Sequence, residues 1–126
     1  MLGSAEAVSF VPSADLARSE RFYADVLGLE LVSRSPFADV YRCGTATLRL
    51  ARVDDLRPQP FTVFGWLVPD LRSVAGELRA RGIELLRYDG LGQDDDAVWR
   101  TPAGDLVAWF QDPDRNVLSV TEMAAR

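Results

Sequence analysis

This chain of 126 residues offers few side chains for catalysis, because it has no histidine and a single cysteine, Cys43. A nucleophilic cysteine needs a neighbouring base or cation that stabilises its thiolate. Arg42 is adjacent in sequence, but consecutive side chains of a strand point to opposite faces of the sheet. We therefore interpret Cys43 as a buried or turn-edge structural residue, and we assign no catalytic residue to the chain.

An acidic run, Asp94-Asp95-Asp96, could suggest a calcium site. The run lacks the spaced ligands and the closing glutamate of an EF-hand loop. We interpret it as part of a solvated loop. Such a loop could cover the mouth of a pocket, where its negative charge would favour cationic ligands.

Composition excludes several classes of function. Hydrophobic residues make up 48% of the chain and charged residues 26%, as in ordinary globular proteins. The net charge of −5 argues against nucleic acid binding, which needs a basic face. No apolar run approaches the roughly 20 residues that cross a bilayer, and residues 1–6 lack the pattern of a signal peptide. One cysteine cannot form an internal disulfide, so we expect a cytoplasmic protein.

The elements that must position any site occur twice in the same order. Hydrophobic alternation and helical spacing in the first half predict a strand over 7–11, a helix over 16–27 that ends at Gly28, and strands over 30–35, 37–42 and 45–51. A segment with two prolines, 54–60, follows as a connector.

The second half predicts a strand over 61–68, a helix from Pro69-Asp70 to Gly82, a strand over 83–87, a loop over 88–96, and strands over 98–101, 105–111 and 117–121. We interpret each half as a βαβββ module. Module one spans about 6–53 and module two about 61–122. Because neither half could bury both faces of its sheet alone, we expect one domain over 1–126.

Two segments carry a family resemblance: RFYADVLGL at 21–29 closes the first helix, and DPDRN at 112–116 precedes the last strand. Within two βαβββ modules, they resemble the vicinal oxygen chelate superfamily, which includes glyoxalases, bleomycin-resistance proteins and extradiol dioxygenases. The resemblance covers 6–122. It implies an α+β fold in which two modules form curved mixed sheets around a pocket with helices on the outer faces, and it implies a homodimer.

The chain departs from the family at one turn position, where Arg115 replaces the usual glycine. If that position needs a positive φ angle, arginine costs roughly 1 kcal/mol there. Otherwise the turn is of another type.

The resemblance also implies where a metal would bind. Family enzymes place His, Gln or Glu on the first, fifth and last strands, and the sequence landmarks put Val8, Val63 and Ser119 there. Two valines and a serine cannot assemble a divalent metal site, and a register error that brings in Ser9 or Thr62 does not help. We therefore expect no metal and no cofactor, and none of the family's metal-dependent activities.

Metal-free members of the family sequester a ligand, and strand alternation predicts which side chains would line such a pocket. These are Val8, Phe10, Thr47, Arg49, Val63, Asp105, Val107, Trp109, Ser119 and Thr121, with Gly65 beside Val63. Trp66 has the opposite parity and is expected to pack under the second helix. The register of Trp99 stays open.

Two of these residues have alternative interpretations. Trp109 could be a core residue whose indole N–H is satisfied locally. Arg49 could be a solvated edge residue, or a pocket residue that pairs with a carboxylate or phosphate of a ligand, or with Asp105.

The favoured function is metal-independent binding of a small, partly aromatic or cationic molecule, as in sequestration of an antibiotic or metabolite. The alternative is a metal-free isomerase or lyase of the same superfamily with Asp105 or Glu122 as the base. A third interpretation is a structural or regulatory domain with a vestigial pocket.

Overall fold

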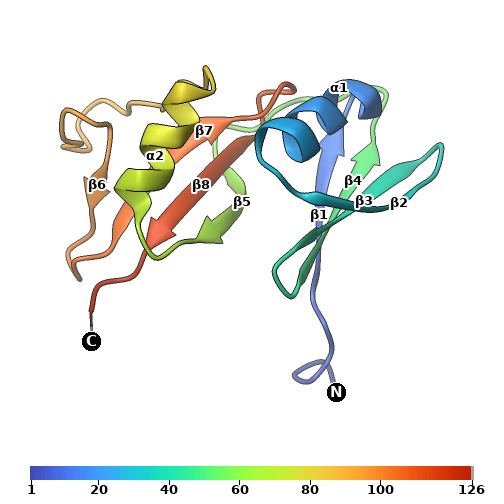
Figure 1. Ribbon diagram of the computed structural model, residues 1–126, viewed down its shortest axis with the longest axis horizontal. Coiled ribbons are helices and arrows are strands. Elements are labelled where there is room, and N and C mark those ends of the chain that lie inside the picture. Colours follow the sequence, from blue (N-terminus) through green and yellow to red (C-terminus); the bar gives the residue numbers. More distant parts are fainter. Residues whose placement is uncertain (126) are drawn as a thin grey trace. The chain divides into compact units, whose positions relative to one another are not determined.

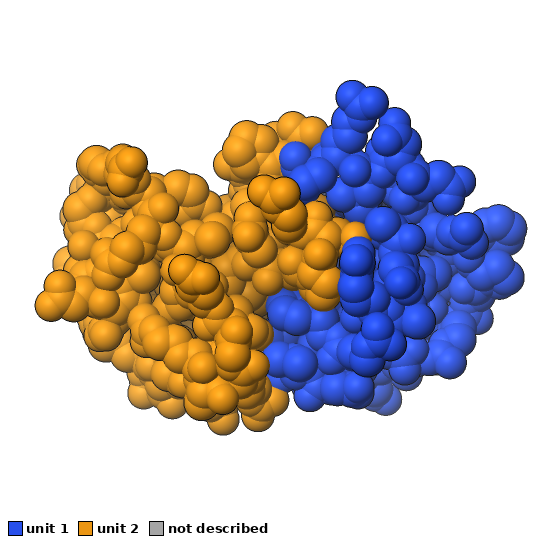
Figure 2. Space-filling view, turned by 90° about the horizontal axis from the view of Figure 1, so that it is seen from above, with its two compact units in different colours: residues 1–58 blue, residues 59–126 orange. Residues whose placement is uncertain are grey.

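The computed structural model describes residues 1–125 of the chain. The chain divides after Pro58, within the segment expected to be a connector, into two compact units (Figure 2). Each unit contains one four-stranded mixed sheet and one helical segment, which makes the fold α+β with two modules (Figure 1). None of the helices within residues 1–125 is long and apolar enough to cross a membrane.

The first unit has the order βαβββ. Its elements are β1 (Val8–Ser13), α1 (Leu16–Glu20) continued by η1 (Arg21–Val26), β2 (Glu30–Arg34), β3 (Ala38–Cys43) and β4 (Ala46–Arg52). The strands lie in the order β1-β4-β3-β2, with β1 parallel to β4 and the other pairs antiparallel.

The first helix covers the predicted range but changes its winding. Asp15 begins it, because its extended backbone lets the side chain accept a hydrogen bond from the Arg18 N–H at 3.1 Å. From Arg21 onward the helix is a π-helix, and the Leu27 N–H donates to the Phe22 carbonyl five residues back. Apolar spacing does not distinguish α from π winding over two turns. Gly28, at a φ angle of 80°, ends the segment as expected.

The second unit repeats the order with β5 (Thr62–Leu67), α2 (Leu71–Ala80), β6 (Trp99–Arg100), β7 (Leu106–Gln111) and β8 (Val117–Glu122). The strand order is β5-β8-β7-β6, and β5 is parallel to β8. Asp70 begins α2 by accepting from the Ser73 N–H at 3.1 Å, and the helix packs against β7 and β8 (Figure 1).

The predicted strand over 83–87 is wrong. One N–H of this segment, that of Leu86, donates to the Trp109 carbonyl at 2.8 Å, but the Leu86 carbonyl accepts from the side-chain amide of Gln93 at 2.9 Å. In a strand, the Leu86 carbonyl would accept a hydrogen bond from a neighbouring strand. Here it accepts from the Gln93 side chain instead. Without this strand the second unit keeps the βαβββ order of the first.

The hydrophobic core of each unit lies on one face of its sheet. In the first unit it includes Val11, Tyr23, Tyr41, Leu48 and Leu50, and in the second Leu71, Ala75, Leu78, Ala108, Phe110, Leu118 and Val120. Because side chains alternate along a strand, the residues between these core positions point to the opposite face of each sheet, which we call the open face. Trp66 stacks on Phe110 at 6.1 Å between ring centres, so it lies on the core side, as its parity predicts.

Candidate functional site

Predicted pocket residues of the second unit meet on the open face of its sheet. Trp109 of β7 lies opposite Ser119 of β8, and Val107 lies opposite Thr121. Gly65 of β5 is on the other side of Ser119. These side chains form two adjacent rows across the sheet, which is the arrangement that strand alternation predicts.

Trp109 is the centre of an aromatic group on this face. Its ring stacks on Trp99 at 6.2 Å between centres with 26° between the planes, and it meets the edge of Tyr88 at 5.2 Å and 90°. Trp99 pairs with Val107, which settles the register that the sequence leaves open. We call Tyr88, Trp99 and Trp109 the aromatic cluster. Burial raises the pKa of Tyr88, so its phenol stays neutral.

The orientation of Trp109 is fixed by Thr62, a residue that sequence reasoning did not place in the site. The Trp109 indole N–H donates to the Thr62 hydroxyl at 3.1 Å. The pairing of β5 with β8 shifts by one residue between Thr62 and Phe64, so Val63 lies at the bulge. The sequence landmarks select Val63, and regular alternation adds Gly65 to it and leaves Thr62 out. No local signal in the sequence marks the bulge.

Gln93 positions the loop that carries Tyr88. Its side-chain carbonyl accepts from the Tyr88 N–H at 2.7 Å, and its amide donates to the carbonyls of Leu86 and Ala97, both at 2.9 Å. One side chain thus joins three backbone groups of the segment 86–97. The sequence gives no signal for this role, because a glutamine in a loop is ordinary.

The acidic run is part of this structured loop. The Asp94 carboxylate accepts from the N–H groups of Asp96 and Val98 and forms an ion pair with Arg72 of α2 at 2.9 Å. Burial by itself raises the pKa of Asp94, but the hydrogen bonds from Arg72 and from the two N–H groups outweigh it and lower that pKa. Arg87 donates to the carbonyls of Asp94 and Asp95. The three aspartates are exposed to solvent, as we expected, and arginines hold the loop in place.

Gly65 lies where two backbones approach closely. A Cβ atom at Gly65 would lie 2.9 Å from the Ser119 carbonyl oxygen and would overlap the Ser119 hydroxyl. Glycine is thus required at this point of the open face, and Ser119 fills the space that a larger residue would take.

The predicted residues of the first unit form a separate row on its own open face. Val8 lies opposite Thr47, and Phe10 lies opposite Arg49. The Arg49 guanidinium is 6.0 Å from the centre of the Phe10 ring, at the outer limit for a cation–π contact. Phe10 is 64% exposed and Arg49 is also exposed, so in this unit neither residue belongs to the core.

The two carboxylates considered as bases each hold a backbone group. An oxygen of Asp105 accepts from the Ala124 N–H at 2.7 Å, and an oxygen of Glu122 accepts from the Leu71 N–H at 2.9 Å at the first turn of α2. Both contacts are those of structural carboxylates.

The residues at the implied metal positions do not fit a divalent ion. Val8 and Val63 have no lone pair, and the one hydroxyl of Ser119 is a poor ligand by itself. Among the described residues, no group of three His, Cys, Asp or Glu side chains is close enough to hold a metal ion.

The turn from 112 to 116 has the geometry that its sequence suggests. Asp112 accepts from the N–H groups of Asp114 and Asn116, both at 2.9 Å, and from the Asn116 side chain at 2.8 Å. Arg115 has a φ angle of 68°, so the position does need a positive φ. This turn sets the start of β8 and hence the place of Ser119.

Comparisons with known proteins agree with this architecture. The family model described as Glyoxalase/Bleomycin resistance protein/Dioxygenase superfamily matches residues 6–120. No curated protein matches the chain.

Several solved structures share the fold at low sequence identity. A lactoylglutathione lyase from Agrobacterium tumefaciens is 22% identical, with a TM-score of 0.73 over 94% of this chain and 93% of that one. A bleomycin resistance determinant encoded on the transposon Tn5 is 21% identical, with a TM-score of 0.75 over 97% and 100%. A glyoxalase/bleomycin resistance protein/dioxygenase from Alicyclobacillus acidocaldarius is 19% identical, with a TM-score of 0.71 over 97% and 93%. Because the family model spans nearly the whole chain, the protein belongs to the Glyoxalase/Bleomycin resistance protein/Dioxygenase superfamily.

Proposed function

We propose that this protein binds a small, partly aromatic or cationic molecule on the open face of its second unit, without a metal ion, and thereby sequesters it. The observation that supports this proposal is the fixed orientation of Trp109, whose indole N–H is held by Thr62 at 3.1 Å. A half-buried indole whose polar atom is already satisfied offers its ring to a ligand.

The energetics of the cluster suit a flat or positively charged ligand. Covering about 100 Å² of apolar surface is worth roughly 2.5 kcal/mol. Stacking on an aromatic ring adds about 0.5–1.5 kcal/mol, and a cation over the ring adds a similar amount. Val107, Ser119 and Thr121 beside the cluster supply an apolar contact and two hydroxyls that could orient the ligand.

The neighbours in fold support either binding or catalysis. One is a bleomycin resistance determinant and another a lactoylglutathione lyase. A metal-free isomerase or lyase would need Asp105 or Glu122 as a base. Since both carboxylates accept hydrogen bonds from backbone N–H groups, we favour binding.

Quenching of tryptophan fluorescence tests this function. The probes are N-methylquinolinium, which is planar and cationic, and neutral quinoline, each titrated with and without a chelator. We expect saturable quenching that the chelator does not change. Replacing Trp109 with alanine should weaken binding at least about tenfold. The matched control is Trp66→Phe, because Trp66 lies on the core side, stacked on Phe110. Equal affinity of Trp109→Ala and wild type would exclude this site.

A homodimer and a cytoplasmic location are part of this proposal. The dimer follows from the family, in which many members are dimeric. Cys43 forms no disulfide within residues 1–125, which is compatible with a reducing compartment. Sedimentation equilibrium should give twice the mass of the chain at micromolar concentration. A single-chain mass at that concentration would contradict the dimer.

A further inference from the structure

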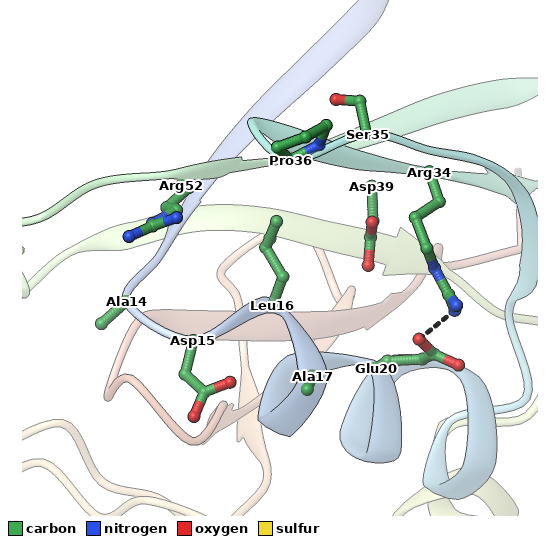
Figure 3. A pocket seen from close by; sticks show the side chains of 10 residues that line it. All are labelled: Ala14, Asp15, Leu16, Ala17, Glu20, Arg34, Ser35, Pro36, Asp39 and Arg52. Atoms are coloured by element: carbon green, nitrogen blue, oxygen red, sulfur yellow. Dashed lines mark hydrogen bonds and ion pairs between the residues drawn. The ribbon is translucent and has the colours of Figure 1, made fainter.

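The first unit contains a cavity on the core side of its sheet, away from the open face. Its volume is about 500 Å³, and its wall comes from α1 and the ends of β2, β3 and β4 (Figure 3). Leu16, Glu20, Arg34, Ser35, Asp39 and Arg52 are among the residues that line it. The cavity is large enough for a small organic molecule.

Asp39 is a buried carboxylate that points into this cavity. Only 2% of the surface of Asp39 is exposed to solvent, and its side chain projects from β3 toward α1 (Figure 3). No group among residues 1–125 donates a hydrogen bond to the carboxylate. A buried carboxylate without donors is expensive, and burial accordingly raises the pKa of Asp39. The Asp39 carboxylate is therefore a hydrogen-bond acceptor in the cavity, and it can accept from a bound ligand.

The neighbouring charges are already compensated. Arg34 forms an ion pair with Glu20 across the cavity (Figure 3), and Arg52 lies 3.5 Å from the Asp54 carboxylate. Asp15 accepts from the first turn of α1. Three carboxylates and two guanidinium groups line the cavity, so its lining has a net charge of −1. Asp39 is the buried carboxylate of this lining, and the nearest guanidinium, that of Arg34, is paired with Glu20 and only partly offsets its charge.

We propose that this cavity binds a small organic cation, an ammonium or guanidinium group on a short apolar stem, whose N–H groups donate to the Asp39 carboxylate. An ionised carboxylate forms strong, charge-assisted hydrogen bonds with such a group. Leu16 and Pro36 line the same cavity and supply apolar contacts for the stem. Ser35 is not a competing donor, since its hydroxyl donates to the Ala38 carbonyl at 3.2 Å.

This site is independent of the aromatic cluster. Asp39 lies opposite Leu50, a core residue, whereas Arg49 and Phe10 occupy the other face of the same sheet. The cluster is in the second unit. Loss of one site should therefore leave the other intact.

The test uses n-butylammonium and methylguanidinium as probes, with n-butanol and butyrate as neutral and anionic controls. Amide NMR titration of the full chain should give saturable shifts at residues that line the cavity with both cations, and none with the two controls. Asp39→Asn should weaken cation binding at least about tenfold. Asp55→Asn removes an exposed carboxylate that pairs with Arg57, and it should bind as the wild type does.

The outcomes separate this inference from the function proposed above. Trp109→Ala should bind butylammonium unchanged, and Asp39→Asn should bind N-methylquinolinium unchanged. If the wild type does not distinguish butylammonium from butanol, or if folded Asp39→Asn binds the cation as tightly as wild type, the site is refuted. The comparison of probes needs only the wild type, so a failure of Asp39→Asn to fold leaves the inference testable.

Discussion

The indole nitrogen of Trp109 lies 3.1 Å from the Thr62 hydroxyl and donates a hydrogen bond to it. The bond joins β7 to the first residue of β5, across β8, which lies between them in the sheet. It satisfies the one polar atom of the indole and restrains its ring plane. Trp99 and Tyr88 therefore pack against a ring of fixed orientation.

Removing this bond should weaken the proposed binding without unfolding the protein. Thr62→Val keeps the shape and the β-branching but lacks the acceptor, so the indole is less well oriented. We expect affinity for N-methylquinolinium to fall about threefold to tenfold, the value of one neutral hydrogen bond. Thr62→Ser keeps the hydroxyl and should bind as the wild type does. Fluorescence titration measures both, and an unaffected Thr62→Val would mean that the bond does not orient the ring.

Gln93 should contribute to stability more than an ordinary loop residue. Replacing it with alanine removes hydrogen bonds to Leu86, Tyr88 and Ala97. At about 1 kcal/mol for each bond, the free energy of unfolding should fall by roughly 2–3 kcal/mol. Gln93→Glu keeps the acceptor for Tyr88 but places a carboxylate oxygen against the carbonyls of Leu86 and Ala97, so urea denaturation should show a loss at least as large as that of Gln93→Ala. A loss below about 0.5 kcal/mol for Gln93→Ala would contradict this role.

Local patterns predict much of this fold and only part of its site. Alternation on β7 and β8 is regular, so it places Trp109 and Ser119 on one face, as the pairing shows. It fails at Thr62, because a bulge is a property of two strands together. It also fails over 83–87, where the side chain of Gln93 competes with strand pairing.

Contacts between distant residues are the part that no local pattern contains. The ion pair of Arg72 with Asp94 joins a helix to a loop 22 residues later. The lack of a donor for Asp39 is equally invisible in the sequence, because it depends on where Arg34 and Glu20 point. Such features need the tertiary structure.

Arg115 should be a position where a substitution stabilises the protein. Its φ angle of 68° is in the left-handed region, where a side chain costs energy that glycine avoids. Arg115→Gly should raise the free energy of unfolding by up to about 1 kcal/mol. Arg115→Ala removes the same charge but keeps the strain, so it should give no gain. Thermal unfolding compares the two, and equal melting temperatures would show that φ strain is not the cause.

Tyr41 buries a hydroxyl that has no partner among residues 1–125. Tyr41→Phe removes that polar atom and keeps the ring beside Tyr23. Because burial of a polar group without a hydrogen bond is unfavourable, the variant should be more stable by on the order of 1 kcal/mol. Urea denaturation at neutral pH measures the change. A loss of stability would show that the hydroxyl does have a partner, such as a bound water.

Asp39 should make the stability of the first unit depend on pH in an unusual direction. Burial raises its pKa above the ordinary 3.8, with Arg34 opposing and Glu20 reinforcing the shift, so the folded state disfavours the ionised form. The cost is absent below the ordinary value and grows as the pH rises through the higher folded value. Asp39→Asn should therefore stabilise the protein at about pH 7 by on the order of 1 kcal/mol and lose that gain near about pH 3. Urea denaturation of both proteins across this range measures the difference.

Saturating butylammonium should reduce the stability difference between Asp39→Asn and wild type at pH 7, because the bound cation compensates the charge of the wild type. A gain that is the same at both pH values would mean that ionisation of Asp39 is not its cause.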